Sequence, residues 1–142
     1  MEFAYKMTPA FRHGTMTPWG GSALKTLYGK DIPDDRTGES LEASTLPGLE
    51  SRAADGRTLT ELAGGPLPLL LKFIDARECL SVQVHPDNAF AAAHEGKLGK
   101  EEAWLILHAE PGAKLVYGLK PGTDLSHVSG RQIEDCLRWV DV

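Results

Sequence analysis

One strand-like segment limits what this chain can fold into. Residues 80–85, with the sequence LSVQVH, alternate between apolar and polar side chains, and Pro86 follows directly. Alternation is typical of a strand with one buried face, and proline ends a strand because it cannot donate to a β-ladder. The polar side chains of the segment share one face: Ser81, Gln83 and His85. The segment predicts a sheet with an apolar core side and a polar side able to hold a ligand.

The rest of the chain predicts a mainly β protein with short helices. Gly, Pro, Ser and Thr are frequent in the first 60 residues, which favours short strands and loops. Apolar runs predict further strands over residues 66–76, 103–107 and 114–117. Apolar residues at helical spacing predict an amphipathic helix at the C-terminus, and its stripe comprises Ile133, Cys136, Leu137 and Val140. The length of 142 residues suits a single domain, residues 1–142.

Capping patterns predict two internal helices. Thr58 and Glu61 fit a capping box, so a short helix is expected to begin near Leu59. Asp87 can cap a helix over residues 88–94, which contain three alanines. Gly and Pro predict turns at residues 19–21 and 111–112.

Charge and composition restrict the partners. With 15 Lys and Arg against 20 Asp and Glu, the net charge of −5 argues against nucleic acid and membrane surfaces, although a small anion remains compatible. The longest apolar run, around residues 67–74, is too short to span a bilayer, and no signal-like leader is visible, so the cytoplasm is expected. Cys79 and Cys136 form no Cys-x-x-Cys pair, which favours reduced thiols over a Cys-based zinc site.

Gln83 and His85 are candidate metal ligands, because side chains two residues apart on a strand can reach the same ion. Imidazole is a good zinc ligand and an amide oxygen is a weaker one. Glu102 opens the predicted strand after the next loop and would add an anionic ligand. A single histidine on a strand face is more often structural, so this spacing alone only suggests a metal site.

Five ordered motifs give the chain a resemblance to a known family. They are WGG at residues 19–21, TGES at 37–40, PLPLLLK at 66–72, LSVQVHPD at 80–87 and GKEEAW at 99–104. Together they resemble the N-terminal portion of class I, zinc-dependent mannose-6-phosphate isomerases, which are cupins. The resemblance implies a partial cupin-like β-barrel, half of a jelly roll. One departure is Leu41, where the family has a tryptophan.

The resemblance also implies roles for individual residues. It implies one zinc ion held by Gln83, His85 and Glu102. It implies pocket positions for four more side chains: Trp19, Glu39, Lys72 and Lys100. Ser81 shares the strand face of the ligands and is a further substrate-binding candidate. Each has a plainer alternative, since Trp19 could serve only the core and Glu39 or Lys100 could be ordinary loop residues.

The implied reaction interconverts mannose 6-phosphate and fructose 6-phosphate through a zinc-stabilised cis-enediol. Zinc would act as a Lewis acid on the substrate oxygens. Lys100 beside the metal is the candidate base, because a nearby dication favours the neutral amine that accepts a proton. Glu39 is the competing base, and the sequence leaves the choice open.

Part of the family pattern has no counterpart in this sequence. The family's fourth metal ligand, a histidine in a later Pro-Ser-Gly-x-x-His-Ala segment, has no match, nor does a late arginine. We therefore expect either a shortened chain, inactive alone, or a natural half-cupin whose open edges favour self-association. Two other functions stay open: a non-catalytic cupin that binds a sugar phosphate or metal as a regulatory module, and a β-rich interaction domain without metal.

Overall fold

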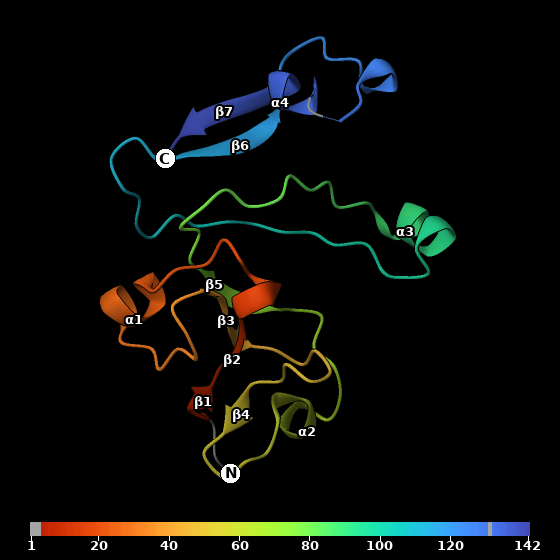
Figure 1. Ribbon diagram of the computed structural model, residues 1–142. Helices are drawn as coiled ribbons and strands as arrows, with labels where there is room; N and C mark the ends of the chain where they lie inside the picture. Colours follow the sequence, from red (N-terminus) through yellow and green to blue (C-terminus); the bar gives the residue numbers. More distant parts are fainter. Residues whose placement is uncertain (1–3, 131) are drawn as a thin grey trace. The chain divides into compact units, whose positions relative to one another are not determined.

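The computed structural model describes residues 4–130 and 132–142, and the chain divides into two compact units, Met1–Ser81 and Val82–Val142. The described residues form mainly short strands and short helices, as the sequence predicted (Figure 1). That both units belong to one domain stays a prediction. Among the described helices, none combines the length and apolar character needed to cross a bilayer.

A three-stranded antiparallel sheet is the centre of the first unit. Its order is β2–β3–β5, with β2 at Ala10–His13, β3 at Thr37–Ala43 and β5 at Leu71–Ile74 (Figure 1). The central strand β3 is bonded on both sides, and Leu41 on it is fully buried. The strand predicted over residues 66–76 is present only from Leu71, because prolines earlier in that segment cannot donate to a ladder.

Small polar side chains, rather than large apolar ones, fill much of the space beside β3. Ser51 is fully buried, and its hydroxyl donates to the carbonyl of Leu41 at 2.8 Å and accepts from the amide of Ser44 at 3.0 Å. Buried hydroxyls are tolerated when their hydrogen bonds are made. These two bonds hold the segment around Ser51 against β3 and the residue that follows it.

Shorter elements surround this sheet. Strands β1 (Met7–Thr8) and β4 (Arg52–Ala53) pair antiparallel, and η1 (Gly14–Met16) follows β2. Helix α2 (Leu59–Ala63) begins at Thr58, whose capping box with Glu61 is present in both directions. The predicted capping box is therefore confirmed.

Helix α1 (Ala23–Tyr28) was not predicted, since only strands and loops were expected in this part of the chain. Its N-cap residue Ser22 makes no side-chain bond to the helix. The amide of Ala23 instead donates to Asp75 Oδ2 at 2.6 Å, directly after β5. At the other end Tyr28 stacks on Phe73 of β5 with ring centroids 5.4 Å apart. Contacts from β5 and from the residue directly after it therefore hold the helix at both ends.

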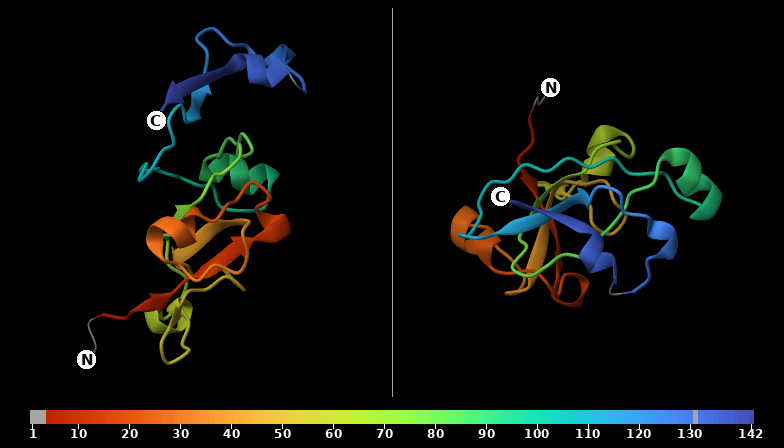
Figure 2. Two further views of the ribbon diagram at one scale, coloured as in Figure 1. Left: turned by 60° about the vertical axis from the view of Figure 1, so that its left-hand side comes forward. Right: turned by 90° about the horizontal axis from the view of Figure 1, so that it is seen from above.

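The second unit contains a helix and a strand pair. Helix α3 (Asn88–His94) is capped by Asp87, whose side chain accepts from the Phe90 amide at 2.8 Å, as predicted. Strand β6 (Lys114–Leu119) pairs antiparallel with β7 (Leu137–Asp141), the two blue strands in Figure 2. Between them lie η2 (Leu125–His127) and α4 (Gln132–Cys136).

The predicted C-terminal helix is wrong over most of its length. Only the five residues of α4 are helical, and Leu137 and Val140 lie on strand β7. Trp139 pairs with Val116, and Val140 pairs with Leu115. Aromatic and β-branched side chains fit a strand, and the ladder with β6 outweighs the helical spacing of the stripe.

Two predicted strands have no ladder in the described residues. Residues 79–87 and 101–110 carry no assigned secondary structure, although both were predicted to contain strands. Val84 is 88 % exposed and Leu105 is 82 % exposed, so the apolar side chains of these segments are not core residues here. An alternating pattern indicates which side chains would share a face of a strand, but a strand forms only when a neighbouring strand is there to pair with it. In the described part of the chain, none of the sheets closes into a barrel.

Candidate functional site

Two segments of the second unit come together at the start of α3. The amide of Gly99 donates to Asn88 Oδ1 at 2.9 Å, and the amide of Lys100 donates to the carbonyl of Pro86 at 3.3 Å. A Cβ on Gly99 would lie only 2.5 Å from that carbonyl oxygen. Glycine at position 99 thus allows the close approach that brings residues 100–102 beside His85.

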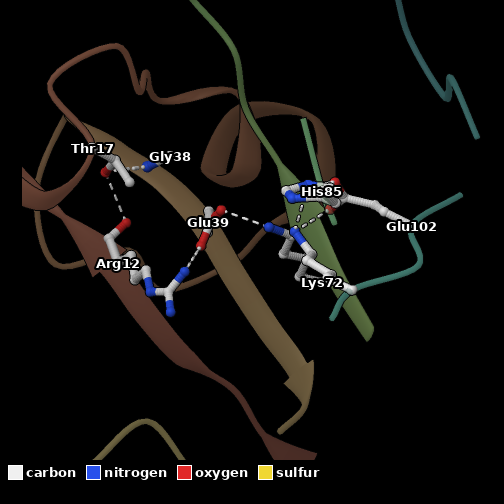
Figure 3. Close-up of polar contacts among 8 residues, drawn as sticks. Arg12, Thr17, Gly38, Glu39, Lys72, His85 and Glu102 are labelled. Carbon is white, nitrogen blue, oxygen red and sulfur yellow. Dashed lines mark hydrogen bonds and ion pairs between the residues drawn. The ribbon is translucent and has the colours of Figure 1, made fainter. Parts of the chain in front are cut away.

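His85, Lys100 and Glu102 form a triangle of polar contacts. His85 Nε2 lies 3.1 Å from Glu102 Oε2 (Figure 3). Lys100 Nζ lies 3.3 Å from His85 Nε2 and 3.1 Å from Glu102 Oε1. The His85 and Glu102 side chains are about a quarter exposed, and that of Lys100 is 43 % exposed. Two predicted metal ligands and the predicted base therefore meet, although no strand carries them.

The donor chemistry of this triangle fits a zinc ion. An imidazole nitrogen and a carboxylate oxygen converge, and both are typical zinc donors. The Lys100 amine lies against both groups, and in its charged form it would oppose a bound dication. Gln83, two residues before His85, is exposed and would add an amide oxygen. Among residues 4–130 and 132–142, no three His, Cys, Asp or Glu side chains gather at one point. His85 and Glu102 are the two side chains of this kind that meet in the triangle. Ser81 is also exposed, on the same segment as Gln83.

The first unit holds a second polar cluster, on the β2–β3–β5 sheet. Glu39 of β3 accepts from Arg12 of β2 at 2.9 Å on Oε2 and from Lys72 of β5 at 2.8 Å on Oε1 (Figure 3). The side chain of Glu39 is 9 % exposed and that of Lys72 is 15 % exposed. The ion pair explains how a lysine is accommodated inside an apolar strand, because a buried ammonium is costly unless it is paired.

Arg12 was missed by the sequence reasoning. It lies in no motif of the resembled family, and nothing near it in sequence marks it as functional. Its position becomes evident only from the register, in which Arg12 and Glu39 are direct cross-strand partners. Such a pairing depends on two segments separated by 27 residues.

Trp19 packs against β3 beside Glu39. Its ring lies over Gly38, where an added Cβ would be 2.6 Å from Trp19 Cζ3 and equally close to the Cβ of Thr17. The carbonyl of Trp19 accepts from the amide of Glu78 at 3.0 Å, and the residue is half-buried. The structure has a turn at residues 18–19, one residue before the predicted 19–21, and this turn brings the tryptophan to the strand that carries Glu39. Leu41, which replaces the family's tryptophan, is fully buried on the same strand.

Comparisons with known proteins place these features in a family. The model of phosphomannose isomerase type I, catalytic domain, matches residues 6–112. A mannose-6-phosphate isomerase of Streptococcus mutans is 41 % identical over 115 residues, which is 70 % of this chain and 36 % of that protein. Mannose-6-phosphate isomerase ManA of Bacillus subtilis is 39 % identical over 116 residues, with the same shares of 70 % and 36 %.

A solved structure agrees with these matches. The crystal structure of the mannose 6-phosphate isomerase from Bacillus subtilis aligns with a TM-score of 0.83 at 32 % identity. The alignment covers 96 % of this chain and 48 % of that one, so the chain spans less than half the length of these relatives. The chain belongs to the type I phosphomannose isomerase catalytic-domain family.

Proposed function

We propose that this chain supplies the N-terminal part of an isomerase that interconverts mannose 6-phosphate and fructose 6-phosphate. The observation that supports the proposal best is the contact of His85 with Glu102 and Lys100. Two metal-binding side chains and an amine within hydrogen-bond distance suit a reaction in which a proton moves between neighbouring carbons. The names of the relatives support the same substrate.

The proposed metal site holds one zinc ion on Gln83, His85 and Glu102. Zinc, when bound, would polarise the hydroxyl and carbonyl oxygens of the substrate as a Lewis acid. The donor set of imidazole, carboxylate and amide is compatible with this metal. A cupin-type barrel, with the metal inside it, is the fold we propose for the complete protein.

The chain's own residues would bind the sugar phosphate and move the proton. Lys100, as a neutral amine, accepts the proton from C2 of mannose 6-phosphate, which leaves a cis-enediolate with its charge on O1. Transfer of the O2 hydroxyl proton to O1, and return of the proton from Lys100 to C1, gives fructose 6-phosphate. Lys72, Trp19 and Ser81 are proposed to bind and orient the substrate, so that binding energy away from the reacting carbons aligns them. Glu39 is the competing base.

Partners and location follow from the same proposal. The partner is a small sugar phosphate, and the net charge of −5 favours neither nucleic acid nor a membrane surface. Sugar phosphates are charged and are retained inside cells, so we propose the cytoplasm. We also propose self-association, because exposed apolar segments such as that of Val84 have no ladder within residues 4–130 and 132–142.

The test follows exchange of the substrate C2 proton with solvent in the longest native chain that carries this sequence. Lys100→Met is expected to lower exchange by about 100-fold or more, the usual contribution of a general base. Glu39→Gln is measured beside it, and Lys97→Met is the control because that side chain is 74 % exposed in the preceding loop. Exchange at the wild-type rate in Lys100→Met would eliminate the lysine base. Substrate binding without any exchange in the wild type would favour a binding module.

A further inference from the structure

Arg12 and Lys72 bind different oxygens of one carboxylate. Arg12 Nη1 donates to Glu39 Oε2, and Lys72 Nζ donates to Oε1 (Figure 3). Arg12 stands directly opposite Glu39 in the β2–β3 ladder, whereas Lys72 is the partner of Leu41 and reaches Glu39 diagonally across the sheet. With each oxygen bound to its own cation, the carboxylate is fixed in both place and rotation.

The backbone around this pair is also fixed. The hydroxyl of Thr17 lies 3.0 Å from the carbonyls of both Arg12 and Arg36, which share its one proton, and it accepts from the amide of Gly38 at 3.0 Å. One buried side chain therefore joins β2 at Arg12 to β3 beside Glu39. The position of the Glu39 carboxylate depends on this join and on the guanidinium together.

Lysine is the flexible member of the cluster. Its long side chain loses much rotamer freedom when it is held in one place, so a directed ammonium needs a rigid partner. Glu39 is almost completely buried and can act as that partner, provided that its own orientation is set. The Arg12 guanidinium, 34 % exposed and held on a strand, is placed to set it.

We propose that Arg12 is a positioning residue that acts through Glu39 to orient the ammonium of Lys72 for the sugar phosphate. The substrate in this statement rests on the proposed function. In this arrangement Glu39 serves the binding of substrate, since both of its oxygens are engaged by cations, and Lys100 is left as the base. Loss of Arg12 then weakens binding of the substrate and leaves the proton transfer nearly intact.

The first measurement observes Lys72 itself by NMR of the lysine ammonium ¹⁵N signals, assigned with Lys72→Met. The wild-type chain is expected to show a slowly exchanging Lys72 signal, and this slow exchange should be reduced in Arg12→Gln and in Glu39→Gln. Arg12→Lys, which keeps the charge, should retain part of it. Arg57→Gln is the matched control, because Arg57 forms a comparable pair with Asp55 on the surface of the same unit. An unchanged Lys72 signal in Arg12→Gln would overturn the proposal.

The second measurement separates KM from kcat in the longest native chain. Arg12→Gln should raise KM for mannose 6-phosphate about tenfold and change kcat by less than about twofold. The double variant Arg12→Gln/Lys72→Met should be no worse than Lys72→Met, because both act on one contact. Multiplying effects, or a fall in kcat with KM unchanged, would contradict the inference. If the wild type does not isomerise while the NMR result is as expected, the positioning stands and the proposed function fails.

Discussion

At Lys100, a cation touches both side chains that we propose as metal ligands. Its ammonium lies 3.3 Å from His85 Nε2 and 3.1 Å from Glu102 Oε1. A dication bound by the same two groups would repel this ammonium, so metal binding and the charged lysine oppose each other. The residue proposed as base is therefore also a determinant of metal affinity.

Replacing Lys100 by Met is expected to tighten zinc binding by several-fold, up to about tenfold, because the lysine is partly exposed and its repulsion is screened. Competition with a chromophoric chelator measures the affinity. His85→Ala should abolish binding, whereas Lys97→Met, from the same loop, should leave it unchanged. Weaker zinc binding in Lys100→Met would mean that the lysine supports the site instead.

Another single-residue effect lies outside the site, at Asp34. His13 Nδ1 lies 2.6 Å from Asp34 Oδ2, and this hydrogen bond, followed by that from the amide of Arg36, lowers the pKa of Asp34 below its ordinary value of 3.8. A carboxyl with a lowered folded-state pKa stabilises the fold above its unfolded pKa. That contribution is lost as the pH falls below 3.8 and through the folded value.

Asp34→Asn should therefore flatten the loss of stability on the acid side. Urea unfolding followed between neutral pH and about pH 3 measures this dependence. Asp35→Asn, which removes the same charge from the neighbouring position, is the control. An identical acid profile in Asp34→Asn and wild type would show that the hydrogen bond to His13 does not favour the charged form.

At the scale of elements, the packing of β3 requires glycine at position 38, because Thr17 and Trp19 lie directly over it. A Cβ at position 38 would lie 2.6 Å from both the Trp19 ring and the Cβ of Thr17. Gly38→Ala should therefore destabilise the chain by about 1–3 kcal/mol, the usual cost of overpacking. The measurement is the urea midpoint with Trp19→Leu beside it, and a midpoint equal to wild type would show that the turn can move away.

The sequence predicted elements where the deciding contacts are local. The Thr58–Glu61 capping box and the Asp87 cap each join residues three apart, so both could be found from spacing alone. Helix α1 could not, since its first amide is bonded by Asp75, 52 residues away. The helix predicted from the C-terminal apolar stripe was wrong because the same residues can also form a strand. Their pairing with β6 is a long-range contact that local spacing does not reveal.

The candidate site was predicted in the same uneven way. The family motifs named His85, Lys100 and Glu102, which the fold brings together, and also Glu39 and Lys72, which form an ion pair. The motifs implied that the first three lie at one metal site, but they did not suggest the ion pair of Glu39 with Lys72. The sequence did not identify Arg12, because its contact with Glu39 depends on the register between two strands that are distant in sequence.

At the scale of the whole molecule, exposed apolar side chains in segments without assigned secondary structure favour self-association. Val84 and Leu105 are more than four-fifths exposed, and their segments have no ladder in the described residues. Such segments can pair with another copy of the chain. Sedimentation velocity across a concentration series should show association of the wild type.

Charged variants test which segments carry that association. Val84→Lys and Leu105→Lys should shift the chain toward monomer, because a charge in either segment opposes its pairing with another copy. Leu69→Lys is the control, since Leu69 is 67 % exposed but lies in a loop of the first unit. A wild type that stays monomeric at all concentrations would exclude this mode of assembly.

The attachment of α1 to Asp75 has a consequence for the order in which the chain acquires structure. Six residues are too few for a helix to persist alone in water, and the groups that hold α1 follow it by about 50 residues. During synthesis, residues 23–28 should therefore remain unfolded until β5 has been synthesised and has paired with β3. The amides of α1 should become protected late in refolding, together with those of β5.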